Sequence, residues 1–132
     1  MIEFTIPLRT QTSGVNLREH FRARARRVKS ERNQTALAIR IATRGNPPPV
    51  LPLEVRLVRF GPTNGLDDDN LPGALKAVRD QIAAWPGIDD RSPDVRWHYH
   101  QTRTKYEWGV LVEIKRGTHE LRHQNPQQAT RV

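Results

Sequence analysis

The 132-residue chain contains no cysteine, so disulfide bonds and thiolate metal sites are excluded. No apolar run approaches the ~20 residues that a bilayer-spanning helix needs. The first ten residues also lack the charged and apolar regions of a secretory signal. Together these absences predict a cytoplasmic protein with no membrane partner.

Acidic residues are scarce as well. The chain has 14 Asp and Glu against 22 Lys and Arg, which gives a formal net charge of +8. An excess of positive charge favours a polyanionic partner, most simply nucleic acid, although composition without a motif is weak support. The length suits one domain with a modest core.

Hydrophobic periodicity predicts two helices. The first runs from about residue 17 to 43 with a thin apolar stripe, and Gly45 and three following prolines end it. Its stripe consists of Leu17, Phe21, Ala25 and Val28. The second runs from about Leu71 to Ala84, with Asn70 as its N-cap and Pro72 in its first turn. Its stripe consists of Leu71, Leu75, Val78 and Ile82.

Alternating apolar and polar residues predict four strands, over 2–8, 53–60, 95–100 and 105–115. A short polar loop separates the last two, so we expect them to form a hairpin. The order β-α-β-α-β-β predicts an α+β fold with two main helices on a small mixed sheet. The domain is expected to span 1–116, followed by a polar, loose tail over 117–132.

The most informative segment begins with Asp67, Asp68, Asp69 and Asn70. Carboxylates packed together repel, and a divalent cation bound by hard oxygen ligands, Mg²⁺ or alternatively Mn²⁺, offsets that repulsion. If the chain here is extended, Asp67 and Asp69 point the same way and can share the cation. The plainer interpretation is a helix cap, but three acids exceed what a cap needs.

A second acidic pair, Asp89 and Asp90, follows the second predicted helix. A helix of about 14 residues is ~21 Å long, whereas the chain from Trp85 to Asp90 covers ~20 Å when extended. A return to the first acidic group is therefore only just within reach. The sequence leaves open a return along the helix, through the edge of the next strand or across a subunit contact.

Two further groups have competing interpretations. Lys76 and Asp80 are four apart, as in a surface helix pair, yet Lys76 could instead face the acidic site and steady a phosphate oxygen. His98 and His100 share one face of a strand, but no third ligand with zinc spacing is nearby, so an exposed or nucleic-acid-facing edge is favoured over a metal pair.

The first predicted helix carries a wide basic face, which we interpret as a contact surface for phosphates rather than as a solvated face. Its candidate DNA-binding residues are Arg18, Arg22, Arg24, Arg26, Arg27, Lys29 and Arg32.

The motif D-x-D-N, then K-x-x-x-D on a helix, then D-D resembles the RusA family of Holliday junction resolvases and their prophage relatives. The motif begins here at Asp67-Asp68-Asp69-Asn70, continues with Lys76 to Asp80, and ends at Asp89-Asp90. The basic helix around His20, Phe21 and Arg22 is also similar to phage-borne members. The resemblance covers roughly residues 1–116.

The resemblance implies a RusA-like fold and a Mg²⁺-dependent, homodimeric endodeoxyribonuclease that nicks two opposing strands of a four-way DNA junction. It also implies that Asp67, Asp69 and Asp90 are the metal ligands and that Lys76 joins them as a catalytic residue. One departure is that Lys76 stands six residues after Asn70, three more than in the shorter family pattern. On a continuous helix that insertion moves the lysine by ~4.5 Å and about 60°.

Two other functions stay open on the sequence. The protein could bind branched DNA without cutting it, with the acidic segment serving as a cap or a metal-stabilised turn. It could also be a nuclease for other branched or single-stranded nucleic acids, including RNA. Cleavage assays on a panel of substrates, with and without a chelator, separate these three functions.

Overall fold

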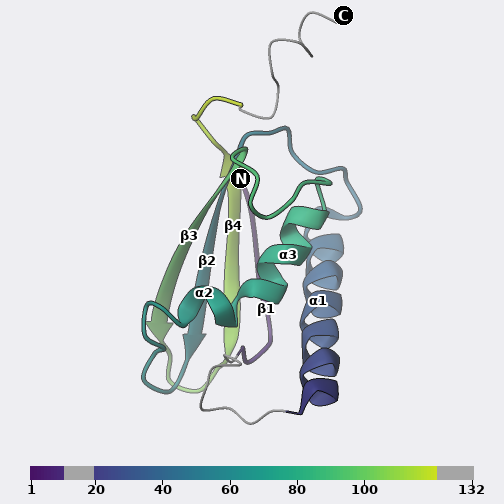
Figure 1. The fold of residues 1–132 in the computed structure, drawn as a ribbon. Coiled ribbons are helices and arrows are strands. Elements are labelled where there is room, and N and C mark those ends of the chain that lie inside the picture. The colour runs from purple at the N-terminus through teal and green to yellow at the C-terminus, as the bar shows by residue number, and fades with distance from the viewer. Residues whose placement is uncertain (11–19, 122–132) are drawn as a thin grey trace, which may run out of the picture.

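The computed structural model describes residues 1–10 and 20–121. Their elements are β1 (Ile2–Ile6), α1 (Phe21–Thr43), β2 (Leu53–Gly61), α2 (Leu71–Ala74), α3 (Lys76–Ala84), β3 (Val95–Arg103) and β4 (Gly109–Arg116). The strands form one mixed sheet, and the helices lie together on one of its faces (Figure 1). The predicted α+β class is confirmed. Within these residues, no helix combines the length and apolar character needed to cross a bilayer.

The sheet has the strand order β1-β4-β2-β3. β4 runs antiparallel to both β1 and β2, whereas β2 and β3 are parallel. The predicted hairpin between the last two strands is therefore wrong, because β2 lies between them. β2 alternates apolar with charged residues from Leu53 to Leu57, and it buries its apolar face at a central position, whereas β3, with His and Arg on one face, occupies an edge.

The connection from β3 to β4 passes the carboxyl end of β2, where a glycine makes room for it. A Cβ at Gly61 would collide with the ring of Trp108, which comes just before β4. The β3–β4 connection can thus cross the end of β2 only because residue 61 has no side chain. The short polar loop between the two strands gives no sign in the sequence that it makes this crossing.

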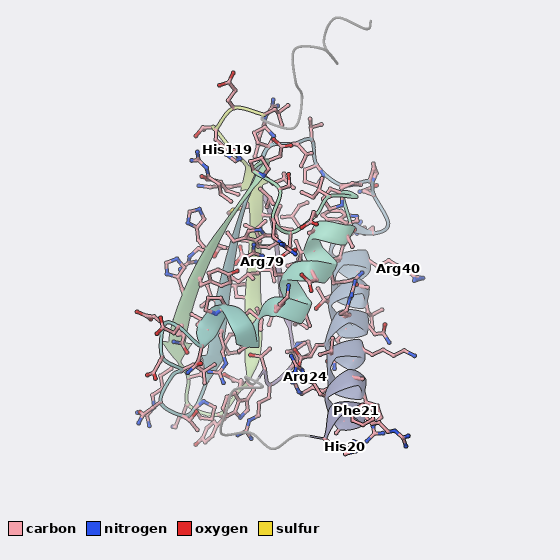
Figure 2. The ribbon with its side chains drawn as sticks, viewed as in Figure 1. His20, Phe21, Arg24, Arg40, Arg79 and His119 are labelled. Atoms are coloured by element: carbon pink, nitrogen blue, oxygen red, sulfur yellow. The ribbon has the colours of Figure 1, made fainter. Side chains whose placement is uncertain are left out.

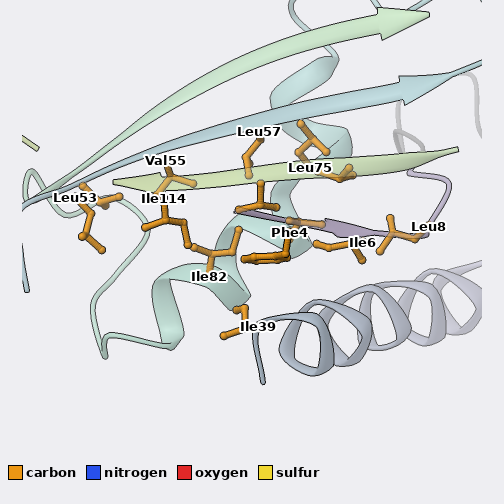
Figure 3. Packing of buried hydrophobic residues seen from close by; sticks show 14 of the residues in the cluster. Phe4, Ile6, Leu8, Ile39, Leu53, Val55, Leu57, Leu75, Ile82 and Ile114 are labelled. Atoms are coloured by element: carbon orange, nitrogen blue, oxygen red, sulfur yellow. The ribbon is translucent and has the colours of Figure 1, made fainter. Parts of the chain in front are cut away.

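The core lies between the sheet and the helices (Figure 3). Phe4 and Ile6 of β1 pack there with strand residues such as Leu57, and Ile39 of α1 and Ile82 of α3 close the layer from the helical side. All four residues of the predicted stripe on the second helix are buried, which confirms that stripe.

The apolar stripe predicted for the start of α1 is exposed and does not contribute to the core. His20 caps this helix, accepting a hydrogen bond at Nδ1 from the backbone of Arg22 (3.1 Å), while the expected start near Leu17 lies outside the described residues. Phe21 is 69% exposed, and Ala25 is exposed too. The residues that α1 buries come from its second half, and they are Glu31, Thr35, Ile39 and Thr43.

The end of α1 agrees with the sequence. Arg44 adopts a left-handed conformation (φ 53°), and Gly45 follows with φ 76°. The backbone N–H of Gly45 donates to Arg40 O at 3.2 Å, which satisfies a carbonyl of the last turn.

The second predicted helix is divided at Leu75 into α2 and α3. Leu75 has φ −101° and ψ 6°, outside the helical range. Its N–H approaches three carbonyls, those of Leu71 (3.2 Å), Pro72 (3.3 Å) and Gly73. Gly73 weakens the helix just before this point. The expectation of one continuous helix is therefore wrong, and Lys76 becomes the first residue of α3.

Most of the predicted loose tail lies outside the described residues, which end at Leu121. Within the described part, Gly117 is buried and its N–H donates to Pro52 O at 2.8 Å.

Candidate functional site

The acidic segment forms a turn rather than an extended approach. Asp67 O accepts hydrogen bonds from the N–H groups of Asn70 (2.9 Å) and Leu71 (3.1 Å). The expectation that Asp67 and Asp69 point the same way along extended backbone is therefore wrong. Asn70 occupies the N-cap position of α2, but its side chain makes no capping hydrogen bond.

The side chains of this acidic turn, which comprises residues 67–70, are all exposed. Asp67, Asp68 and Asp69 form no ion pair and accept no side-chain hydrogen bond from the part of the chain that the structure describes. Their carboxylate oxygens are therefore open to solvent, so a hydrated cation can reach them.

Gln101 of β3 holds the approach to the acidic turn. Its Oε1 accepts from the N–H of Leu66 (2.8 Å), and its Nε2 donates to the carbonyl of Leu66 (2.6 Å). This side-chain amide thus pairs with the backbone as a neighbouring strand would. Because Leu66 immediately precedes Asp67, the turn is fixed at the carboxyl end of β3. No sequence signal marked Gln101 for this contact.

The second acidic pair returns to the start of α3. Asp90 Oδ2 lies 3.7 Å from Lys76 Nζ, which also contacts Asp80 Oδ1 at 3.2 Å. The break at Leu75 shortens the distance, because the nine residues of α3 span only ~13.5 Å. Both interpretations of Lys76 thus have a geometric basis, since it pairs with its helix neighbour and with an aspartate of the motif.

Arg79 anchors this return, and the sequence analysis missed it. Its Nε lies 3.0 Å from Asp90 Oδ2, and its Nη2 donates to Asp90 O at 2.9 Å. Nη1 donates to the hydroxyl of Tyr99, and the guanidinium lies 5.0 Å from the ring centroid of Trp97. Trp97 Nε1 donates to the same Asp90 carbonyl at 2.9 Å. Figure 2 shows Arg79 where α3 faces the sheet.

Spacing could have revealed Arg79, because it follows Lys76 by three residues on one helix face. Asp89, in contrast, is exposed, and its Oδ1 accepts from the N–H of Arg91 at 2.8 Å. This backbone hydrogen bond lowers the pKa of Asp89, and the charges of Arg91 and Lys76 act in the same direction.

The carboxylates fit Mg²⁺ by donor type but do not form a closed cage. Across residues 1–10 and 20–121, no three His, Asp or Glu side chains gather closely enough to hold a metal ion. Mg²⁺ commonly uses only one or two protein carboxylates and completes its shell with water and substrate phosphates. The exposed acidic turn offers oxygens of that kind, while Asp90 already neutralises two cationic side chains.

A groove of about 590 Å³ runs along the first half of α1. Its apolar floor includes Phe21, Ala25 and Val28, and the basic side chains beside them are Arg24, Lys29 and Arg32. Gln81 of α3 closes one side and accepts a hydrogen bond from Arg32 Nε at 3.2 Å. We refer to it as the basic groove. Figure 2 shows Phe21 and Arg24 at the first turns of α1.

The remaining candidate DNA-binding residues differ in placement. Arg22 and Arg26 are exposed, in keeping with a contact surface. Arg27 instead forms an ion pair with the buried Glu31 (3.0 Å), so it faces inward. Arg18 lies outside the described residues. His98 and His100 lie on the helix-free face of the sheet, in a depression that also contains Glu54 and Glu113.

Comparison of the chain with protein-family models, with curated proteins and with solved structures gave no match.

Proposed function

We propose that this protein is a RusA-like, Mg²⁺-dependent endonuclease that cuts branched DNA, with four-way junctions as its substrate. The observation that carries the proposal is the return of Asp90 to Lys76, at 3.7 Å. Residues separated by 14 positions in the motif meet at the start of α3, one short helix after the acidic turn. A simple helix cap at residues 67–70 requires no such meeting.

The chemistry assigned to the site follows from its charges. Asp67, Asp69 and Asp90 are the carboxylates that would hold Mg²⁺. Because no three acidic or histidine side chains of the described residues gather closely enough to hold a metal ion, the proposal requires these carboxylates to move together when the metal binds. The bound metal would activate water and offset charge on the phosphate oxygens. Both ion pairs of Asp90 end on Oδ2, so Oδ1 lies outside them. Lys76 is 64% exposed at its side chain and can approach a substrate oxygen without leaving α3. Arg79 holds Asp90 in position from beneath.

The basic groove supplies the affinity in this proposal. Arg24, Lys29 and Arg32 would contact backbone phosphates, which fixes a strand without reading its sequence. The exposed Phe21 ring at the end of the groove offers a stacking surface for an unpaired base. Continuous base stacking is interrupted at a branch point, where a base can open onto such a ring, so the combination suits a branched substrate better than uniform duplex. A homodimer, as the family resemblance implies, would present two such sites to two strands.

The first test compares two neighbouring aspartates. Asp67→Asn should lower the rate of Mg²⁺-dependent junction cleavage by at least ~100-fold, while leaving the melting temperature unchanged because the side chain is exposed. Asp68→Asn removes the same charge from the same turn and should retain cleavage. A fluorescent junction assay with an EDTA arm measures both. Equal activity of the two variants would contradict the assignment of Asp67.

A second candidate function is branched-DNA binding without cleavage. Two observations favour it: Asp90 is paired with Lys76 and Arg79, and no three acidic or histidine ligands gather within the described ranges. A panel of four-way junction, flap, duplex and RNA substrates distinguishes the candidates. Binding to the junction with no Mg²⁺-dependent product would select this one. Preferential cutting of RNA or single strands would indicate a different nuclease.

A further inference from the structure

A second cationic centre lies at the carboxyl ends of β2 and β3, apart from the basic groove. A pocket of about 230 Å³ is lined by Arg59 of β2 and by Gln101 and Arg103 of β3. The loop after β2 closes it with Thr63, Asn64 and Gly65. We refer to it as the loop pocket. None of the candidate site residues from the sequence analysis lines it.

Arg59 is the unusual member of this pocket, because it is only 8% exposed. Its Nε donates to Thr10 Oγ1 and its Nη2 donates to Thr10 O, both at 3.1 Å. These bonds use two of the five N–H groups of the guanidinium. No carboxylate among residues 1–10 and 20–121 forms an ion pair with Arg59. Burying a cation without a counter-charge costs free energy, and a bound anion would lower that cost.

Neighbouring residues increase the positive charge around Arg59. The guanidinium carbons of Arg9 and Arg59 lie 4.3 Å and 5.4 Å from the ring centroid of Trp108, so both arginines stack on one indole. Burial lowers the pKa of Arg59, and the nearby charge of Arg9 lowers it further. Both effects mean that the protonated form is held at a cost, and a bound anion would relieve that cost.

The polar lining favours an anion with several acceptor oxygens. Arg103 is exposed, and its Nη1 lies 3.4 Å from Asn64 Oδ1 at the pocket mouth. A Cβ at Gly65 would lie 2.7 Å from Gln101 Oε1, so glycine at this position lets the loop close against β3. Two arginines and neutral polar groups around a small cavity match an oxyanion such as a phosphate better than an apolar ligand.

We propose that the loop pocket binds a backbone phosphate of a nucleic-acid strand, with Arg59 and Arg103 as its ligands. The pocket loop continues through Leu66, which Gln101 holds, directly into Asp67. A phosphate seated there fixes the strand beside the acidic turn. The identity of the ligand as a nucleic-acid strand rests on the proposed function, whereas the binding of a phosphate group does not.

The test uses Arg103→Gln, because an exposed residue can be changed with little risk to folding. Arg96→Gln is the matched control, since it removes the same charge from an exposed position on the same strand, outside the pocket. In EDTA, where no cleavage occurs, a short single-stranded oligonucleotide and inorganic phosphate are titrated against ¹⁵N-labelled protein. Arg103→Gln should weaken oligonucleotide binding by about 10-fold, as expected when one charge-assisted hydrogen bond is removed, and Arg96→Gln should not.

Arg59→Met provides a second variant, with its melting temperature measured to establish that it folds. In wild-type protein the Arg59 Nε–H signal should shift on titration with either probe. Equal oligonucleotide affinities for wild type, Arg103→Gln and folded Arg59→Met would overturn the proposal, as would binding of inorganic phosphate but not of the oligonucleotide.

The outcomes also separate the pocket from the nuclease. Pocket-dependent oligonucleotide binding by a protein that cuts nothing would sustain the pocket and reject the nuclease. Junction cleavage by a protein whose oligonucleotide affinity is unchanged by Arg103→Gln would sustain the nuclease and reject the pocket.

Discussion

Arg79 is the residue on which the acidic site most depends. Its guanidinium contacts the carboxylate and the carbonyl of Asp90, the hydroxyl of Tyr99 and the ring of Trp97. One planar cation therefore joins α3, the return loop and β3. A lysine could not reproduce this, because it lacks a rigid fork of donors. The site thus owes its shape to a residue that does not itself belong to the acidic motif.

Arg79→Ala should lower the free energy of unfolding by about 2–3 kcal/mol, because it removes the closer of the two cationic partners of Asp90 and the charged donor to the Asp90 carbonyl. Urea denaturation followed by circular dichroism measures the change. Arg91→Ala is the control, since Arg91 is exposed and only its backbone N–H contacts Asp89, and it should change stability by less than ~0.5 kcal/mol. A destabilisation no larger for Arg79→Ala than for Arg91→Ala would show that the anchor is unimportant.

Among the elements, the division between α2 and α3 has the largest effect on the site. A continuous helix would have carried Lys76 onward along a single axis. The break instead makes Lys76 the first residue of a short helix, within reach of Asp90. Gly73 is a poor helix residue, and the fully buried Leu75 fixes the joint against the core.

Two glycines with open surroundings should respond in opposite directions to alanine. A Cβ at Gly73 or at Gly45 would meet no atom within 4 Å. Gly73 is helical, so Gly73→Ala should stabilise the protein by about 0.5–1 kcal/mol. Gly45 has φ 76°, so Gly45→Ala should destabilise it by ~1 kcal/mol. Urea denaturation of both variants tests this, and changes of the same sign would contradict the description of α2 or of the α1 terminus.

Across the whole molecule, charge is distributed differently on the two sides of the sheet. On the helix-free face, Arg56 pairs with Glu113 at 2.7 Å and Lys115 approaches Glu54 at 3.5 Å. On the helical side, Arg24 and Lys29 line the basic groove without an acidic partner among the described residues. A polyanion should therefore approach the helical side, where the acidic turn also lies.

Salt dependence tests this orientation. DNA affinity should fall steeply with salt, and changing both Arg24 and Lys29 to Gln should reduce the slope of log K against log[salt] by about one for each phosphate that the variant no longer neutralises. Arg96→Gln, which alters an exposed position of β3 outside the groove, should leave the slope unchanged. Fluorescence anisotropy at several salt concentrations measures it. An equal reduction in the Arg96 variant would mean that binding follows net charge rather than the groove.

Much of the architecture could be read from local spacing. The period of Leu71, Leu75, Val78 and Ile82 predicted a buried helical stripe, and β2 was recognisable from the alternation of apolar and charged residues that begins at Leu53. Such patterns depend only on residues a few positions apart, so a single sequence contains them. The start of α1 misled the same reasoning, because its periodic Phe21 and Ala25 line a surface groove and not the core.

The placement of the acidic groups required the folded chain. Asp90 meets Lys76 only because α3 is short and Arg79 fixes the return loop, and residues 67–70 turn where an extended path was expected. The strand order and the burial of Arg59 likewise arise from contacts between residues far apart in the chain. Spacing along a sequence specifies which face a side chain occupies, but the partner it meets there depends on how distant segments pack together.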